Sequence, residues 1–210
     1  MRNKNTVSAK VYLIGLFFCM TFVNAQNSDI NILRDINVHR NKNLDPTFKL
    51  VTNSAVPVSV AIPIILYSVA LIKKDSTIKQ QAIFIGEAFL VNAFITTALK
   101  HTIKRNRPFE TYPNIDQVAS SVGNSFPSGH TSLAFATATS LSMAYPKWYI
   151  IAPSFVWAGA VGYSRMHLGV HYPSDVFAGA IIGSGSAYLS YKMNKWINKE
   201  KLKKEKHYSK

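Results

Sequence analysis

Two histidines, an arginine and an aspartate fall within the stretch YSRMHLGVHYPSD, between two apolar runs of the chain. A buried charge costs free energy unless a partner compensates it, so this cluster indicates either solvated groups or chemistry. Asp175 lies four residues after His171, and its carboxylate can hold one ring nitrogen so that the other points outward as a nucleophile. His167 has no aspartate four residues further on, and we expect it to be structural.

A second cluster, KHTIKRNRP, is basic and lies at the end of an apolar run. Lys100 and Arg107 are seven residues apart, which would place them on one helix face two turns apart. Pro108 disfavours further helix at the arginine. Two cations at a helix end suit an anion such as phosphate, which arginine can bind through two hydrogen bonds. The alternative for this cluster alone is an anchor for lipid head groups.

A third stretch, GNSFPSGHTS, combines small residues with a histidine at an expected helix start. Pro127 fits the first helical position, where its missing N–H does no harm. Ser128 and Gly129 would then offer free amides at the positive end of the helix dipole, and glycine lets an oxyanion approach closely. His130 would face an anion held there. The alternative is a helix cap beside a bystander histidine.

Together the three stretches resemble the type 2 phosphatidic acid phosphatase (PAP2) superfamily, of the bacterial membrane type. Its motifs are K-x6-RP, PSGH and SR-x5-H-x3-D, and every motif position is matched in order between residues 100 and 175. The resemblance implies His171 as the nucleophile that forms a phosphohistidine, with Asp175 as its partner. It implies His130 as proton donor to the leaving oxygen and later as the base that activates water. The residues implied to bind the phosphoryl oxygens are Lys100, Arg107, Ser128, Gly129 and Arg165.

Phosphoryl transfer needs in-line positioning and neutralisation of charge on the equatorial oxygens, which cations and helix amides can supply. We therefore predict a metal-independent lipid phosphatase, a phosphoric monoester hydrolase without a cofactor. A metal centre built from His130, His171 and Asp175 is one alternative, although three adjacent cations would repel a divalent ion. A non-catalytic protein that only binds lipid phosphates is another.

Five apolar segments must position these residues, and none shows strand alternation or an internal repeat. They span Ser54–Ile72, Ala82–Leu99, Thr131–Tyr145, Trp148–Tyr163 and Val176–Met193. The sequence thus predicts an all-α fold, a bundle of about five transmembrane helices, or six if an N-terminal signal stays uncleaved. The segments are short for membrane spans, and the mean hydropathy is near zero. A soluble exported acid phosphatase with the same site is therefore the alternative.

The N-terminal residues 1–25 have the pattern of a signal peptide, with a basic start, the apolar run Val11–Val23 and a small-residue cleavage site. The only cysteine, Cys19, lies inside it, so the mature chain has no thiol chemistry. An apolar stripe at Ile30, Leu33 and Ile36 predicts an interfacial helix that ends before Asp45-Pro46. Residues 26–193 are expected to form the phosphatase domain and residues 194–210 a basic cytoplasmic tail.

The net charge of +14 is concentrated in eight lysines between Lys192 and Lys210. The rest of the chain is apolar, so this tail indicates lipid head groups and not nucleic acid as the partner. By the positive-inside rule the tail is cytoplasmic, which places the site on the outer face of the bacterial inner membrane. Candidate substrates are undecaprenyl diphosphate, phosphatidylglycerol phosphate and lipid A phosphates. Glu87, inside an apolar segment, is expected to pair with Lys73 or Lys74.

Overall fold

The computed structural model describes residues 27–208, and this part of the chain consists of helices and connections, without a strand. Each of the five predicted apolar segments lies in a long helix. These helices are α3 (Ala55–Lys73), α4 (Ser76–Ile103), α6 (Gly129–Ala144), α7 (Trp148–His167) and α8 (Pro173–Tyr208). The predicted all-α fold is confirmed. The predicted signal peptide lies outside the described residues.

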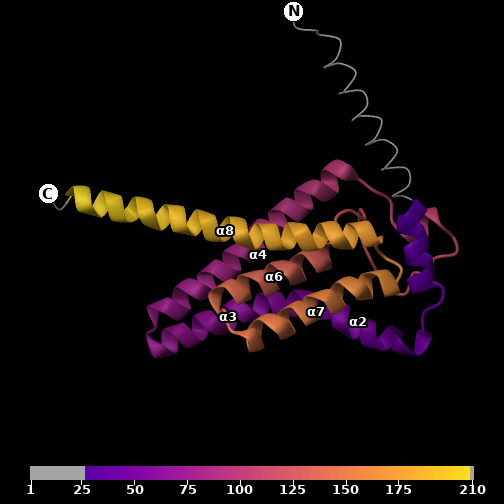
Figure 1. Cartoon of the computed structure of the whole chain (residues 1–210), viewed down its shortest axis with the longest axis horizontal. Helices are drawn as coiled ribbons and strands as arrows, with labels where there is room; N and C mark the ends of the chain where they lie inside the picture. The colour runs from indigo at the N-terminus through magenta and orange to yellow at the C-terminus, as the bar shows by residue number, and fades with distance from the viewer. Residues whose placement is uncertain (1–26, 209–210) are drawn as a thin grey trace, which may run out of the picture.

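Helix α6 forms the centre of the bundle and contacts α3, α4, α7 and α8 (Figure 1). Its closest neighbour is α8, because a Cβ atom added at Gly183 would lie only 2.1 Å from the carbonyl oxygen of Ser132. On the other side, buried Ala134 packs with Ala55 and Ala158. Small side chains let helices approach this closely, in agreement with the Ala, Gly, Ser and Thr content of the third and fifth segments.

Large apolar side chains point outward from several helices of the bundle. Ile64 on α3 is 59% exposed, Phe94 on α4 is 77% exposed and Phe177 on α8 is 70% exposed. Two helical stretches, 42–73 and 76–111, are long and apolar enough to cross a membrane. Extended apolar surfaces of this kind are uncommon on soluble monomers and mark contact with lipid or with a partner.

The polar N-terminal region packs over one end of the bundle. A helix over residues 27–37 buries Ile30 and Leu33 against Ile115 and Tyr172, so the predicted N-terminal helix is present. After the short η1 (Lys42–Leu44), a further helix, α2 (Asp45–Asn53), begins. The sequence did not predict α2, although a proline at the start of a helix is well tolerated.

The connections between helices separate into two groups at opposite ends of the bundle (Figure 1). One end holds the 27–37 helix, the α4–α6 connection, which includes α5 (Pro108–Thr111), and the α7–α8 connection. The other end holds the α3–α4 and α6–α7 turns. Helix α8 continues to Tyr208, so residues predicted as a tail prolong the fifth helix. The predicted pairing of Glu87 with lysine is wrong, because its carboxylate accepts a hydrogen bond from Asn194 on α8.

Candidate active site

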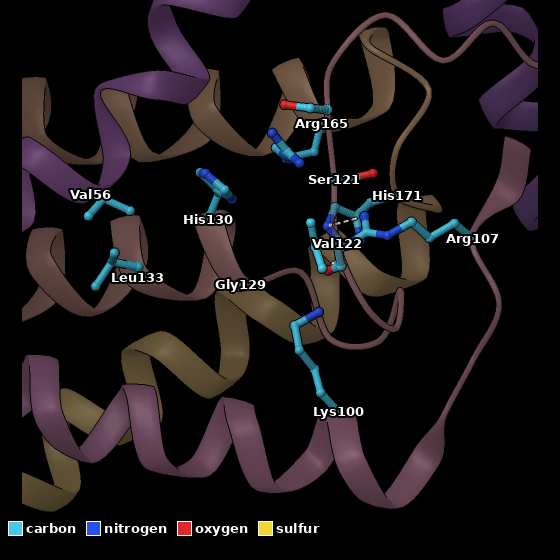
Figure 2. Close-up of a pocket in the computed structure, with 11 residues that line it drawn as sticks. Val56, Lys100, Arg107, Ser121, Val122, Gly129, His130, Leu133, Arg165 and His171 are labelled. Carbon is cyan, nitrogen blue, oxygen red and sulfur yellow. Dashed lines mark hydrogen bonds between the residues drawn. The ribbon is translucent and has the colours of Figure 1, made fainter.

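A cavity of about 380 Å³ opens at the end of the bundle where the long polar connections gather. Six of the eight predicted site residues line it, namely Lys100, Arg107, Gly129, His130, Arg165 and His171. The rest of the lining is Val56, Ser120, Ser121, Val122 and Leu133. Figure 2 shows the three cations and two histidines turned toward this common space. None of the described residues that line the cavity is acidic, so its charge favours an anion.

His171 lies in the α7–α8 connection and is 2% exposed. Its Nδ1 is 3.5 Å from Oδ2 of Asp175, and its Nε2 is 3.4 Å from Nη1 of Arg107. Burial, reinforced by the guanidinium groups of Arg165 and Arg107 and opposed by Asp175, lowers the pKa of His171 to about 3. The imidazole is therefore neutral at pH 7. A proton on Nδ1, facing the carboxylate, leaves the Nε2 lone pair on the cavity side.

Asp175 is fully buried in the first turn of α8 and has several hydrogen-bond donors. Its Oδ2 accepts from the Ser125 hydroxyl at 2.5 Å and from the Tyr172 amide at 3.0 Å. Its Oδ1 accepts from Nη1 of Arg105 at 2.6 Å. Sequence reasoning assigned no role at Asp175 to Ser125 or Arg105. They lie 50 and 70 residues away along the chain, and no local pattern links them to Asp175.

Lys100 and Arg107 reach the same cavity, but not from one helix face. Helix α4 ends at Ile103, and the next residue, Lys104, has a left-handed φ of 49°. Arg107 therefore lies in the following loop, with an extended backbone. The predicted explanation from helical spacing is wrong, although the expectation that both cations serve one site agrees with their positions.

Three successive carbonyl groups of the loop before α6 hold these two cations. The Lys100 Nζ donates to the Asn124 carbonyl at 2.6 Å. Arg107 donates from Nε to the Gly123 carbonyl at 2.8 Å and from Nη2 to the Val122 carbonyl at 3.0 Å. The loop thus fixes both side chains at the edge of the cavity without placing a negative side chain inside it.

Ser128 is the N-cap residue of α6, which begins at Gly129. Pro127 therefore precedes the cap, and the prediction that it takes the first helical position is wrong. The Ser128 amide donates to the Asp175 carbonyl at 3.1 Å, and its hydroxyl pairs with Thr131 at 2.8 Å. Ser128 does not line the cavity. It connects the start of α6 to the start of α8, whereas Gly129 is open to the cavity.

Among the residues that the structure describes, two at the cavity carry a buried polar atom without a hydrogen-bond partner. These atoms are Nε of Arg165 and the hydroxyl of Ser121. Buried polar groups are nearly always paired, so these two indicate donors kept for an acceptor that binds in the cavity. Nη1 of Arg165 donates to the Thr52 hydroxyl on α2 at 2.7 Å. Sequence reasoning missed Ser121 and Thr52, because nothing distinguishes them from other polar loop and helix residues.

His167 lies away from the cavity and joins α7 to α2. Its Nε2 is 2.8 Å from Oδ1 of Asp45, and its ring packs on Phe48 with centroids 4.3 Å apart. Its carbonyl accepts a hydrogen bond from Asn37 at 2.9 Å. These contacts agree with the predicted structural role.

The metal alternative finds no support in the arrangement of ligands. Within the described residues, no group of three or more His, Cys, Asp and Glu side chains is placed to hold a metal ion. Asp175 faces Arg105 and Ser125, and His130 lies among cations. The donors around the cavity are N–H and O–H groups, which suit an oxyanion.

The sequence model that describes the PAP2 superfamily matches residues 81–199, which is more than half of the chain. The chain belongs to the PAP2 superfamily. The matched range contains the three motifs and all residues that line the cavity except Val56.

Two curated proteins and one solved structure illustrate the relation to known PAP2-like proteins. The chain is 36% identical over 107 residues to the bacitracin transport permease protein BcrC of Bacillus licheniformis, covering 50% of this chain and 51% of that protein. It is 33% identical over 104 residues to an undecaprenyl-diphosphatase of Sulfolobus acidocaldarius, covering 49% and 50%. The chain spans about half the length of these relatives. The crystal structure of LpxE from Aquifex aeolicus matches with a TM-score of 0.67 and 30% identity, over 78% of this chain and 94% of that chain.

Proposed function

We propose that this protein hydrolyses a lipid-linked phosphate or diphosphate through a phosphohistidine at His171. One observation carries the proposal: a neutral, buried imidazole faces a cavity whose described lining has three cations and no acidic side chain. The unpartnered Nε of Arg165 and hydroxyl of Ser121 add two donors without an acceptor. Positively charged donors arranged around a nucleophile are what phosphoryl transfer requires.

In the first step, the Nε2 lone pair of His171 attacks phosphorus, and the bond from phosphorus to the leaving lipid oxygen breaks. That oxygen takes a proton from His130, whose protonated form is favoured by the negative charge of the bound phosphoryl group. The lipid therefore leaves as an alcohol, or as a lipid monophosphate when the substrate is a diphosphate. Asp175 stabilises the positive charge that develops on the nucleophilic ring. The equatorial oxygens are held by Lys100, Arg107 and Arg165, with Gly129 allowing close approach to the start of α6.

In the second step, His130 is neutral and takes a proton from a water molecule. The resulting hydroxide attacks phosphorus, the nitrogen–phosphorus bond breaks, and its electron pair returns to Nε2 of His171. Inorganic phosphate leaves and the free enzyme is restored, with the proton back on His130. Ser128 was predicted to bind phosphate directly. Its contacts favour an indirect part, because it joins α6 to the carbonyl of Asp175.

We further propose that α3, α4, α6, α7 and α8 span the bacterial inner membrane, with the cavity on the periplasmic face and residues 26–193 as the phosphatase domain. The outward apolar side chains of α3, α4 and α8 support this arrangement. The end opposite the cavity carries the exposed Lys73, Lys74, Lys79 and Lys147, as the positive-inside rule requires of a cytoplasmic face. The 27–37 helix would lie where the periplasmic surface of the inner membrane meets water. The end of α8 would form the basic cytoplasmic segment.

The substrate class is a lipid phosphate such as undecaprenyl diphosphate, phosphatidylglycerol phosphate or a lipid A phosphate. The resemblance to an undecaprenyl-diphosphatase supports the first of these. Val56 and Leu133 give the cavity an apolar side next to the cations, which suits the first carbons of a lipid chain.

The test is release of inorganic phosphate by the purified full-length chain in detergent, with the three lipid phosphates and p-nitrophenyl phosphate as substrates. We expect faster turnover of at least one lipid phosphate than of the soluble ester. His171→Ala should abolish turnover, whereas His101→Ala, which changes an exposed histidine on α4, should leave it unchanged. Substrate labelled in the phosphoryl group should leave label on the wild-type chain after an alkaline quench. Turnover that survives His171→Ala would refute the mechanism, and preference for the soluble ester would refute the lipid substrate.

A further inference from the structure

Arg105 lies in the loop between α4 and α5, behind the proposed nucleophile and outside the cavity lining. Its Nη1 donates to Oδ1 of Asp175 at 2.6 Å and to the Ser174 hydroxyl at 2.7 Å. Its Nη2 donates to Oδ2 of Asp29 at 2.7 Å. The guanidinium also lies 3.8 Å from the centre of the Tyr172 ring. One side chain therefore connects the N-terminal helix, the α4–α5 loop and the start of α8.

The charge on Asp175 requires such a partner. The carboxylate is fully buried. The imidazole of His171, which lies next to it, is neutral in the free enzyme. Ser125 and the Tyr172 amide donate to it but carry no net charge. Arg105 is the cation in hydrogen-bond contact with it, and a buried carboxylate without a counter-charge tends to take up a proton. A protonated Asp175 carries no charge, so it would no longer stabilise the positive charge that develops on His171.

Asp29, on the 27–37 helix, holds the other side of this arginine. It is 8% exposed, and besides Arg105 it accepts from the Ser174 amide at 2.8 Å and the Ser174 hydroxyl at 2.5 Å. It thus fixes both the guanidinium and the first turn of α8, where Asp175 lies. Lys100 and Arg107 have their own partners in the loop carbonyls and face the cavity, so they do not replace Arg105.

We propose that Arg105 is a positioning residue for His171 that acts through Asp175, and that Asp29 of the N-terminal helix holds Arg105 in place. This inference rests on the proposed phosphatase function. The cations then have two separate roles, because those in the cavity bind the phosphoryl group, while Arg105 keeps the carboxylate behind the nucleophile ionised and oriented. The 27–37 helix thereby becomes part of the active-site framework.

The test compares Arg105→Gln with Arg40→Gln in the full-length chain. Arg40 is a matched control, because its buried guanidinium also joins two carboxylates, Asp45 and Asp116, but does not line the cavity. For Arg105→Gln we expect kcat to fall roughly 10–100-fold, as when the partner that orients a functional histidine is removed, with KM nearly unchanged. Arg40→Gln should lower stability and leave kcat nearly unchanged.

The pH profile separates positioning from a structural role. The charged and titratable groups facing Asp175 are His171, Arg105 and Tyr172, with Arg107 and Lys100 across the cavity. Without Arg105 the carboxylate loses its counter-charge and takes up a proton at higher pH. The acid limb of kcat/KM should therefore move to higher pH in Arg105→Gln and stay in place in Arg40→Gln. Arg105→Lys should have a higher kcat than Arg105→Gln. Asp29→Asn should lower kcat and move the acid limb to higher pH, but by less than Arg105→Gln does.

If Arg105→Gln does not fold, as judged by its thermal unfolding, Asp29→Asn carries the same comparison. Wild-type kcat and an unmoved acid limb in Arg105→Gln, or in Asp29→Asn where the first variant does not fold, would refute the positioning role. So would equal losses of activity in the Arg40 and Arg105 variants. A wild-type chain that releases no phosphate from any lipid phosphate would refute the proposed function itself, and the positioning role with it.

Discussion

Gly183→Ala is the most direct test of the α6–α8 contact that brings the active-site residues together. A Cβ atom at Gly183 would lie 2.1 Å from the Ser132 carbonyl oxygen and 2.8 Å from the Ala136 amide nitrogen. Both are backbone atoms of α6, so they move only if the helix moves. Gly185 lies two residues further along α8, and a Cβ atom there would meet nothing within 4 Å. Gly185→Ala is therefore the matched control.

The expected magnitude follows from the geometry. Ordinary contact begins near 3.4 Å, so the two helices must separate by roughly 1 Å at this point, in an interior packed as densely as a crystal. Overpacking of this kind costs about 1–3 kcal/mol. Both substitutions gain up to about 1 kcal/mol from the better helix propensity of alanine. Because that gain is common to both, Gly183→Ala should be less stable than Gly185→Ala by about 1–3 kcal/mol.

The same substitution should lower activity, because α6 carries His130 and α8 begins beside His171 and carries Asp175. A misplacement of about 1 Å can reduce a rate on the order of 100-fold. The assay is the midpoint of thermal unfolding in detergent together with phosphate release from a lipid phosphate. Gly185→Ala should match or exceed the wild type in stability and keep its activity. Equal stability and activity of the two variants would refute the close helix contact.

Four further outcomes test the chemistry. The pH–rate profile should be bell-shaped, with an acid limb near pH 3 that belongs to His171 and Asp175 as a coupled pair. The rate should fall at higher pH as His130 loses its proton, and a rate that only rises with pH would contradict these roles. Ser121→Ala should weaken inhibition by vanadate roughly tenfold, because a donor to a charged acceptor is lost, and an unchanged inhibition constant would contradict it. His167→Gln should cost about 1–3 kcal/mol of stability with kcat nearly unchanged, and a large fall in kcat would give it a catalytic part. Chelators should leave turnover unchanged, and activity restored by a divalent ion would revive the metal alternative.

The parts of the fold that could be predicted are those with a local signal. Apolar runs bounded by polar stretches marked the five long helices. The residues of the three motifs could be grouped because their types and spacing are specific, and six of them meet at one cavity. The helical spacing that was expected to bring Lys100 and Arg107 together is not how the fold does so. Arg107 reaches the cavity from a loop, so its closeness to Lys100 depends on tertiary structure and not on helical periodicity.

The parts that could not be predicted depend on contacts between distant segments. Thr52 meets Arg165 across 113 residues, and Asp29 meets Ser174 across 145. Polar residues of these types are common at surfaces, and a single sequence gives no reason to expect them at a site. Ser128 shows the same limit in another way. Its expected place in the first turn of a helix suggested an open amide, but that amide donates to the carbonyl of Asp175.

The basic cluster after α4 conflicts with the charge bias expected of an outer loop, and its contacts resolve the conflict. Lys100 and Arg107 are held by loop carbonyls at the cavity, and Arg105 pairs with two carboxylates. Lys104, the fourth cation of the cluster, is exposed. Charge bias reflects cations that stay solvated beside the membrane surface, whereas the other three are committed to partners in the folded protein. The cluster therefore does not count against a cavity that opens on the outer face.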